Sequence, residues 1–310
     1  MDIRDRRGLK AAARESLAAA SYDPGKLILI HTGAMAALSL LIALLGYLLD
    51  RQIGGTGGLG GLGLRSVLET AQTVLSYGQI VVMLFWRMGY VYVTLQLSRR
   101  RAVGPGSLLE GFRNFLPVLR LQLMLALQSL GIVLLCVYLA SAVFSFTPWA
   151  APLMEAYEVG TEEELLAAME ACMPPVMGLT VVAMLIVAVP YLYRLLLAEL
   201  SLMDDPSLGA RRAIRRSREM MQGNRRSLLM LDLSFWWFYL LELLISVLSY
   251  GDLLLMIFGV ELPWSDTVNY YLFVVIAYVL QLALYRWRGN ELQVTYAKFY
   301  EALLPNEEPR

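Results

Sequence analysis

The sequence has very few of the residues that build disulfide frameworks, metal sites and catalytic triads. It contains two cysteines, Cys136 in an apolar run and Cys172 in an acidic loop, and one histidine, His31, also in an apolar run. Two thiols so placed form neither a disulfide framework nor a CxxC site. A metal or a Ser-His-Asp triad would depend on His31 without the neighbouring Cys or His ligands that a zinc ion needs. We therefore expect no metal and no cofactor, and we interpret His31 as an interfacial side chain.

Recognisable catalytic motifs are also missing. The chain has no HExxH, no GxSxG and no Walker loop. The stretch GTGGLGGLG is followed by neither Lys-Thr nor Lys-Ser, so it does not match a phosphate-binding loop. We predict that the protein is not an enzyme. An intramembrane enzyme stays open as an alternative that this sequence does little to support.

Charged residues are scarce, at 17% of the chain, whereas 58% of residues are hydrophobic. Soluble domains usually carry about 25% charged residues. A helix needs about 20 mostly apolar residues to cross a hydrocarbon core about 30 Å thick. Six segments qualify, and the sequence predicts an all-α, polytopic membrane protein that forms a single membrane domain over residues 1–310. The predicted spans are 27–49, 67–97, 116–146, 176–202, 228–258 and 268–287.

The basic residues are unevenly distributed between the loops. Most lie in residues 1–26, 97–120, 203–226 and the C-terminal tail, which all fall on one side of the membrane if six spans are drawn. Lys and Arg are retained in cytoplasmic loops, so this asymmetry predicts that both termini are cytoplasmic. The zero net charge gives no electrostatic reason to expect a nucleic-acid partner.

Two loops on the opposite side have distinctive compositions. Loop 50–66 is rich in glycine, and we expect it to be flexible. Loop 147–175 is acidic, and Thr161 with Glu164 matches a capping box. We predict a short helix over about 161–172, stopped by Pro174 and Pro175. Its acidic residues are interpreted as a solvated face, with a cation site as the alternative.

The cytoplasmic segments resemble short amphipathic helices that precede a span. In the second, Ser107 and Glu110 match a capping box after Gly104-Pro105-Gly106. In the third, Asp205 can cap, Pro206 suits the first turn, and Gly223-Asn224 can end the helix. The residues of one face of this third helix are small or apolar, and they are Ala210, Ala213, Ile214, Ser217 and Met221. We predict that such helices lie flat in the membrane interface, with the apolar stripe at the acyl boundary.

The other face of the third helix is basic, and its residues are Arg211, Arg212, Arg215, Arg216 and Arg218. Anionic lipid attracts basic residues near a membrane surface, by about 1 kcal/mol for each residue. We predict that these arginines contact anionic phospholipid or another membrane protein. The alternative is that they only set the topology.

Several ionisable residues fall within the predicted spans. They are Arg87, Arg194, Glu199, Asp232 and Glu242. Charges at membrane depth are costly and usually face the bundle interior with a partner. We predict a buried charge network in which Arg194 pairs with Asp232 and Arg87 pairs with Glu242. The alternatives are snorkelling side chains, or a transporter or channel component that uses these charges.

An amphipathic helix followed by two spans occurs three times, over 1–97, 98–202 and 203–302. This order of elements suggests a threefold internal repeat.

The stretch 190–238 resembles the bacterial integral membrane family known as domain of unknown function 975. The matching features are Tyr191, Tyr193, Arg194, Asp205-Pro206, Gly209-Ala210, Ala213-Ile214, Ser217, Met221, Gly223 and 231–235. The segments 9–14 and 296–303 also match, whereas the glycine-rich first loop and the long acidic loop depart from the family pattern. The resemblance implies a six-span protein of a bacterial cell membrane and does not imply a mechanism.

Overall fold

The computed structural model describes residues 2–54, 59–251, 255 and 266–304, and every regular element in these ranges is helical. The predicted all-α class is therefore confirmed. The longer helices are α1 (Arg6–Ala18), α2 (Pro24–Gly54), α3 (Leu59–Ser98), α5 (Phe115–Ser145), α7 (Glu162–Ala183), α10 (Gly209–Met220), α12 (Trp236–Leu248), α14 (Asp266–Leu284) and α15 (Asn290–Leu303). The shorter ones are η1 (Pro105–Leu109), α4 (Glu110–Arg113), η2 (Pro148–Ala150), α6 (Ala151–Val159), α8 (Val189–Leu192), α9 (Ala198–Asp204), η4 (Pro206–Leu208) and α11 (Arg225–Leu233), together with the π-helical segments η3 (Met184–Ala188) and η5 (Tyr285–Gly289).

Five helical stretches are long and apolar enough to cross a membrane. They are Pro24–Leu48, Ser66–Ser98, Phe115–Ser145, Glu162–Leu192 and Val268–Leu303. A sixth stretch consists of α11 and α12, which pass the same test together but meet at an angle of 63°. The described part of the chain therefore contains five such helices, or six if the bent pair forms one span. The outer end of the predicted fifth span, beyond residue 251, lies mostly outside the described residues.

The glycine-rich loop is shorter than the sequence indicated. Helix α2 continues to Gly54 and α3 begins at Leu59, so most of segment 50–66 is helical. Residues 55–58 lie outside the described part of the chain. The prediction of a flexible loop over the whole segment is therefore wrong, because the glycines cost helix stability without forbidding a helix.

The paired prolines do not end the acidic helix. The capping box is confirmed, because Thr161 Oγ1 accepts from the Glu164 N–H at 3.3 Å and Glu164 Oε2 accepts from the Thr161 N–H at 2.8 Å. Helix α7, however, runs through Pro174 and Pro175 to Ala183. Prolines are tolerated in long apolar helices when the freed carbonyl groups find other partners. The predicted stop at residue 172 is therefore wrong.

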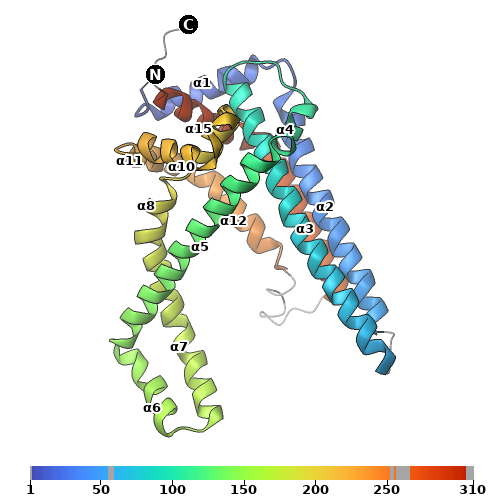
Figure 1. Cartoon of the computed structure of the whole chain (residues 1–310), viewed down its shortest axis with the longest axis vertical. Helices are drawn as coiled ribbons and strands as arrows, with labels where there is room; N and C mark the ends of the chain where they lie inside the picture. The colour runs from blue at the N-terminus through green and yellow to red at the C-terminus, as the bar shows by residue number, and fades with distance from the viewer. Residues whose placement is uncertain (1, 55–58, 252–254, 256–265, 305–310) are drawn as a thin grey trace. The chain divides into compact units, whose positions relative to one another are not determined.

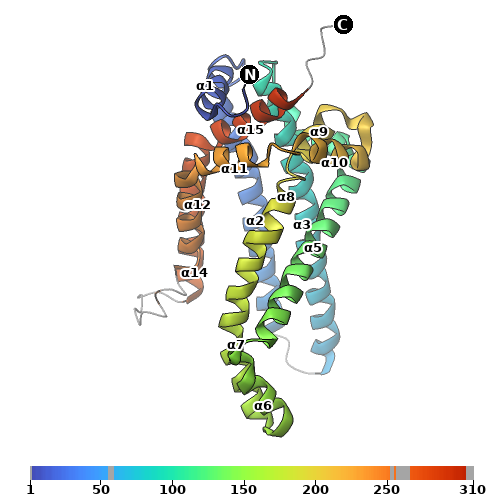
Figure 2. The ribbon, with the colours of Figure 1, turned by 90° about the vertical axis from the view of Figure 1, so that its left-hand side faces the viewer.

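The chain forms two compact units. The first contains Met1–Val118 and Arg226–Arg310, and the second contains Leu119–Arg225. In the first unit, α1 and α15 lie against each other at one end of α2 and α3 (Figures 1 and 2). A buried apolar cluster joins these four helices, and its members include Ala13, Leu27, Val93, Leu97 and Val294.

Two glycines allow η1 and α4 to pack directly on α3. A Cβ atom added to Gly89 would lie 1.7 Å from the Leu108 carbonyl oxygen, and one added to Gly111 would lie 1.9 Å from the Phe85 carbonyl oxygen. Both obstacles are backbone atoms, so a side chain at either position would force the two segments apart. The backbones therefore touch at a spacing that only glycine permits.

The start of this segment differs from the prediction. The Ser107 hydroxyl accepts from the Gly104 N–H at 3.4 Å, so Ser107 occupies the third position of η1 and does not cap a later helix. Pro105 is the reason, because proline favours the first helical position and moves the start of the helix forward. Within η1, Leu108 is buried and the neighbouring Leu109 is exposed.

The second unit contains most of α5 together with α6 to α10. In Figure 1, α6 lies at one end of α5 and α7, and α10 lies near α8 at the opposite end of α7. Helices α9 and α10 pack against each other, and Gly209, at φ +70°, joins η4 to α10. As predicted, the Asp205 side chain accepts from the Ser207 N–H at 3.0 Å and Pro206 begins the first turn.

We expect Gly111→Ala to destabilise the protein. The added methyl group must displace backbone, and overpacking of this kind typically costs about 1–3 kcal/mol of unfolding free energy. Thermal unfolding of the full chain in detergent measures the loss. Gly78→Ala, in α3, is the matched control because a Cβ atom there meets open space. Equal stability of Gly111→Ala and the parent protein would contradict the close packing.

Candidate functional site

The basic residues of α10 form an arginine face that consists of Arg211, Arg212, Arg215, Arg216 and Arg218. All are exposed except Arg216, which is half-buried. The helix ends at Met220, and Gly223 follows with φ +83°, as the sequence predicted for its C-terminus. The face therefore occupies about two turns of α10.

The opposite face of α10 is buried inside the protein. Ala210, Ala213, Ile214, Ser217 and Met221 are each less than 7% exposed. The Ser217 hydroxyl donates to the Arg194 carbonyl oxygen at 2.8 Å, which ties α10 to the turn before α9. The prediction that this stripe lies at the acyl boundary is therefore wrong, because packing on α9 removes it from any lipid. This packing fixes the direction in which the arginines project.

The arginines of this face differ in their partners. Arg218 donates to the Gln128 side-chain oxygen at 2.7 Å and to the Tyr191 hydroxyl at 3.5 Å. Arg215 lies 3.7 Å from Glu219 in an exposed pair. Such pairs contribute little free energy. Arg211, Arg212 and Arg216 have no ion pair or hydrogen bond from their side chains to the described residues. Part of the arginine face is therefore available for an external anion.

The predicted charge network does not lie buried as a group. Arg87 and Arg194 are exposed, and the three acids Glu199, Asp232 and Glu242 are half-buried. Long arginine side chains can cover apolar surface while the guanidinium stays outside. The buried network stays a prediction.

The acids of this group instead accept hydrogen bonds from neutral side chains. Glu199 accepts from Gln122 Nε2 at 2.9 Å, Glu242 accepts from the Tyr285 hydroxyl at 2.7 Å, and Asp232 accepts from the Tyr296 hydroxyl. Arg194 and Asp232 belong to different compact units. The pairs Arg194–Asp232 and Arg87–Glu242 stay predictions.

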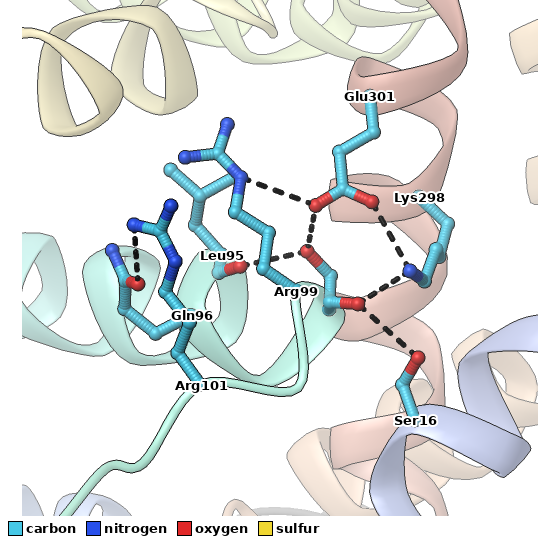
Figure 3. Close-up of polar contacts among 8 residues, drawn as sticks. Ser16, Leu95, Gln96, Arg99, Arg101, Lys298 and Glu301 are labelled. Carbon is cyan, nitrogen blue, oxygen red and sulfur yellow. Dashed lines mark hydrogen bonds and ion pairs between the residues drawn. The ribbon is translucent and has the colours of Figure 1, made fainter. Parts of the chain in front are cut away.

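A polar junction that the sequence analysis missed lies at the C-terminal end of α3 (Figure 3). The Ser98 carbonyl oxygen accepts from the Ser16 hydroxyl at 3.2 Å and from Lys298 Nζ. Glu301 accepts from the Ser98 hydroxyl, and it lies 3.4 Å from Arg99 and 3.1 Å from Lys298. A helix C-terminus leaves carbonyl groups unpaired and favours nearby cations. Helices α1 and α15 thus both bind the end of α3.

Glu291 forms a second link between α15 and α1. Its side chain is 7% exposed, and it pairs with Arg14 at 2.8 Å and with Arg288. The spacing of Arg288 and Glu291, three residues apart in a helix, could have identified the second pair from the sequence. The partner on α1 could not be identified, because it lies 277 residues away.

Lys10 links α1 to the bend between α11 and α12. Its ammonium group donates to the Ser234 carbonyl oxygen at 2.9 Å and lies 3.7 Å from the centre of the Phe235 ring. Burial lowers the pKa of Lys10 below its usual value, while the Glu291 carboxylate acts in the opposite direction. Lys10 and Arg14 of α1 are thus held by contacts within the protein, unlike Arg211 and Arg212 of α10.

The thiols and the histidine do not assemble a catalytic or metal centre in the described part of the chain. Cys136 and Cys172 are free and buried. No three His, Cys, Asp or Glu residues among those described could hold a metal ion. His31 is 8% exposed and stacks on the Tyr90 ring at 4.3 Å, so it packs inside the protein.

We expect Glu291→Gln to lower the free energy of unfolding by about 1–3 kcal/mol, because Arg288 and Arg14 lose a shared anion that is largely removed from solvent. Chemical denaturation of the detergent-solubilised chain measures this change. Glu219→Gln is the control, since it breaks an exposed pair and should change stability by less than about 0.5 kcal/mol. Similar losses for both variants would show that burial of Glu291 has no energetic consequence.

Comparison with known proteins places the chain in a family without assigning an activity. No curated protein and no solved structure matches it. The family model described as "Protein of unknown function (DUF975)" matches residues 1–307. This confirms the resemblance drawn from segment 190–238. The chain therefore belongs to the DUF975 family.

Proposed function

We propose that the protein spans the membrane of a bacterial cell six times, with both termini in the cytoplasm, and binds anionic phospholipid headgroups at the arginine face of α10. One observation carries the proposal. The apolar residues of α10 are buried within the protein, so the arginines project outward, and three of them have no partner among the described residues.

Membrane insertion is supported by the surface of the apolar helices. Large apolar side chains along α5 are mostly exposed, including Leu123 at 69% and Leu127 at 70%. Soluble monomers rarely expose large contiguous apolar patches. Hydrocarbon would solvate these side chains, and the helices satisfy their own backbone hydrogen bonds. The bend between α11 and α12 is proposed to lie within the fifth span.

Phosphate is the ligand chemistry that suits the arginine face. A guanidinium group can donate two parallel hydrogen bonds to phosphate oxygens. Each basic residue near an anionic surface contributes about 1 kcal/mol. The role is one of binding and not of catalysis. An acidic surface on another membrane protein is the alternative occupant.

The transport alternative receives less support. It requires charges inside the helix bundle, whereas Arg87 and Arg194 are exposed. The threefold repeat stays a prediction.

We expect the double variant Arg211→Gln/Arg212→Gln to bind phosphatidylglycerol about 30-fold more weakly than the parent, because two contributions of about 1 kcal/mol are lost. Native mass spectrometry of the full chain with added phosphatidylglycerol or phosphatidylcholine measures the affinities. Phosphatidylcholine binding should not change.

Arg4→Gln/Arg7→Gln is the matched control, because it removes the same charge from exposed positions outside α10. An equal loss of phosphatidylglycerol affinity in both double variants would show that only net charge matters. No loss in either variant would contradict the proposed site.

A further inference from the structure

A cavity of about 260 Å³ lies between α12 with the residues that follow it and α14, within the first compact unit. Three of its lining residues are apolar. The others carry hydroxyl or amide groups, and they are Ser246, Ser249, Tyr250, Tyr270, Tyr278 and Gln281. No lining residue carries a charge at neutral pH. This is an uncharged, hydrogen-bonding cavity between two strongly apolar helices.

Most of these polar side chains have no hydrogen-bond partner among the described residues. The Ser246 and Ser249 hydroxyls donate to carbonyl oxygens of their own helical turn, at 2.8 and 2.6 Å, which leaves their oxygen atoms free to accept. Tyr250, Tyr270, Tyr278 and Gln281 make no hydrogen bond to any described residue. Tyr278 and Gln281 are half-buried, whereas Tyr250 and Tyr270 are exposed. A polar group removed from water without a partner costs free energy.

The lining residues of α14 follow one face of the helix. Tyr270, Val274, Tyr278 and Gln281 recur at three- and four-residue spacing, which places them in a row along the helix. At a rise of 1.5 Å per residue, the row extends about 16 Å from Tyr270 to Gln281. This is about half of the hydrocarbon thickness. If the helices span the membrane as proposed, the cavity offers hydrogen bonds at depths where lipid chains offer none.

We propose that this cavity binds the hydroxyl-bearing headgroup of an uncharged membrane lipid, of the diacylglycerol or glycosyl-diacylglycerol class. The inference rests on the membrane insertion proposed above and not on the arginine face. Tyrosine hydroxyls and a glutamine amide both donate and accept, so they match alcohol groups of a ligand. The absence of a lining cation gives the cavity no preference for phosphate. Val247 and Val275, which follow the lining residues Ser246 and Val274 in the sequence, are exposed and suit acyl chains.

The test uses the full chain in detergent and native mass spectrometry with three added probes. The probes are dioleoylglycerol, monoglucosyl-dioleoylglycerol and phosphatidylglycerol. We expect the double variant Tyr278→Phe/Gln281→Leu to bind the two neutral lipids about tenfold more weakly than the parent, because hydrogen bonds from two side chains are lost. Its affinity for phosphatidylglycerol should not change. The variant Arg211→Gln/Arg212→Gln should instead bind phosphatidylglycerol more weakly and bind the two neutral lipids as the parent does.

Tyr271→Phe is the matched control, since it removes a hydroxyl from the same helix outside the cavity lining. Equal neutral-lipid affinity in the cavity variant and the parent overturns the inference. So does a lack of neutral-lipid binding by the folded parent, which would assign the cavity to water. Glycerol or glucose that competes as strongly as the lipids would identify a soluble polyol and would overturn the lipid assignment. If Arg211→Gln/Arg212→Gln binds phosphatidylglycerol as strongly as the parent, the arginine-face proposal is contradicted and the cavity proposal is unaffected.

Discussion

The structure depends on one constraint, which is that long apolar segments must satisfy their backbone hydrogen bonds internally. Stretches such as Phe115–Ser145 do this as continuous helices. Because backbone groups must find hydrogen-bond partners within the helix, α7 continues through Pro174 and Pro175 and the glycine-rich segment is mostly helical. Departures from regular helix occur where other groups support them, as at the bend after α11, where Lys10 binds the Ser234 carbonyl oxygen.

Helix α15 packs against α1 and α3 at one end of the first unit. Tyr300 and Phe299 are fully buried, and Glu291, Lys298 and Glu301 bind α1 and α3. Two amphipathic helices with similar sequence patterns therefore have different roles. The cations Lys10 and Arg14 of α1 hold the fold together, whereas Arg211 and Arg212 of α10 are held outward by the packing beneath them. The proposed lipid contact follows from this difference, which sequence pattern alone does not reveal.

The sequence predicted the features that depend on local chemistry. Helical class, the Thr161–Glu164 capping box, the Asp205 cap and the end of α10 near Gly223 all follow from neighbouring residues. The sequence did not predict features that depend on contacts between segments far apart in the chain. The stripe of α10 is buried against α9, and the partners of Ser98 lie on helices far away in the chain. The unpaired hydroxyls of the cavity were not identified either, because their significance depends on how α12 and α14 face each other.

The central claim is that the chain spans the membrane and keeps its basic helices in the cytoplasm. The side of the membrane on which the start of α10 lies tests this claim most directly. In a chain whose native cysteines, Cys136 and Cys172, are replaced by serine, single cysteines can be introduced as Ser207→Cys before α10 and as Tyr157→Cys in α6. Both positions are exposed. A membrane-impermeant thiol reagent applied to intact cells should label Tyr157→Cys only, and Ser207→Cys should react only after permeabilisation. Labelling of Ser207→Cys in intact cells would contradict the account.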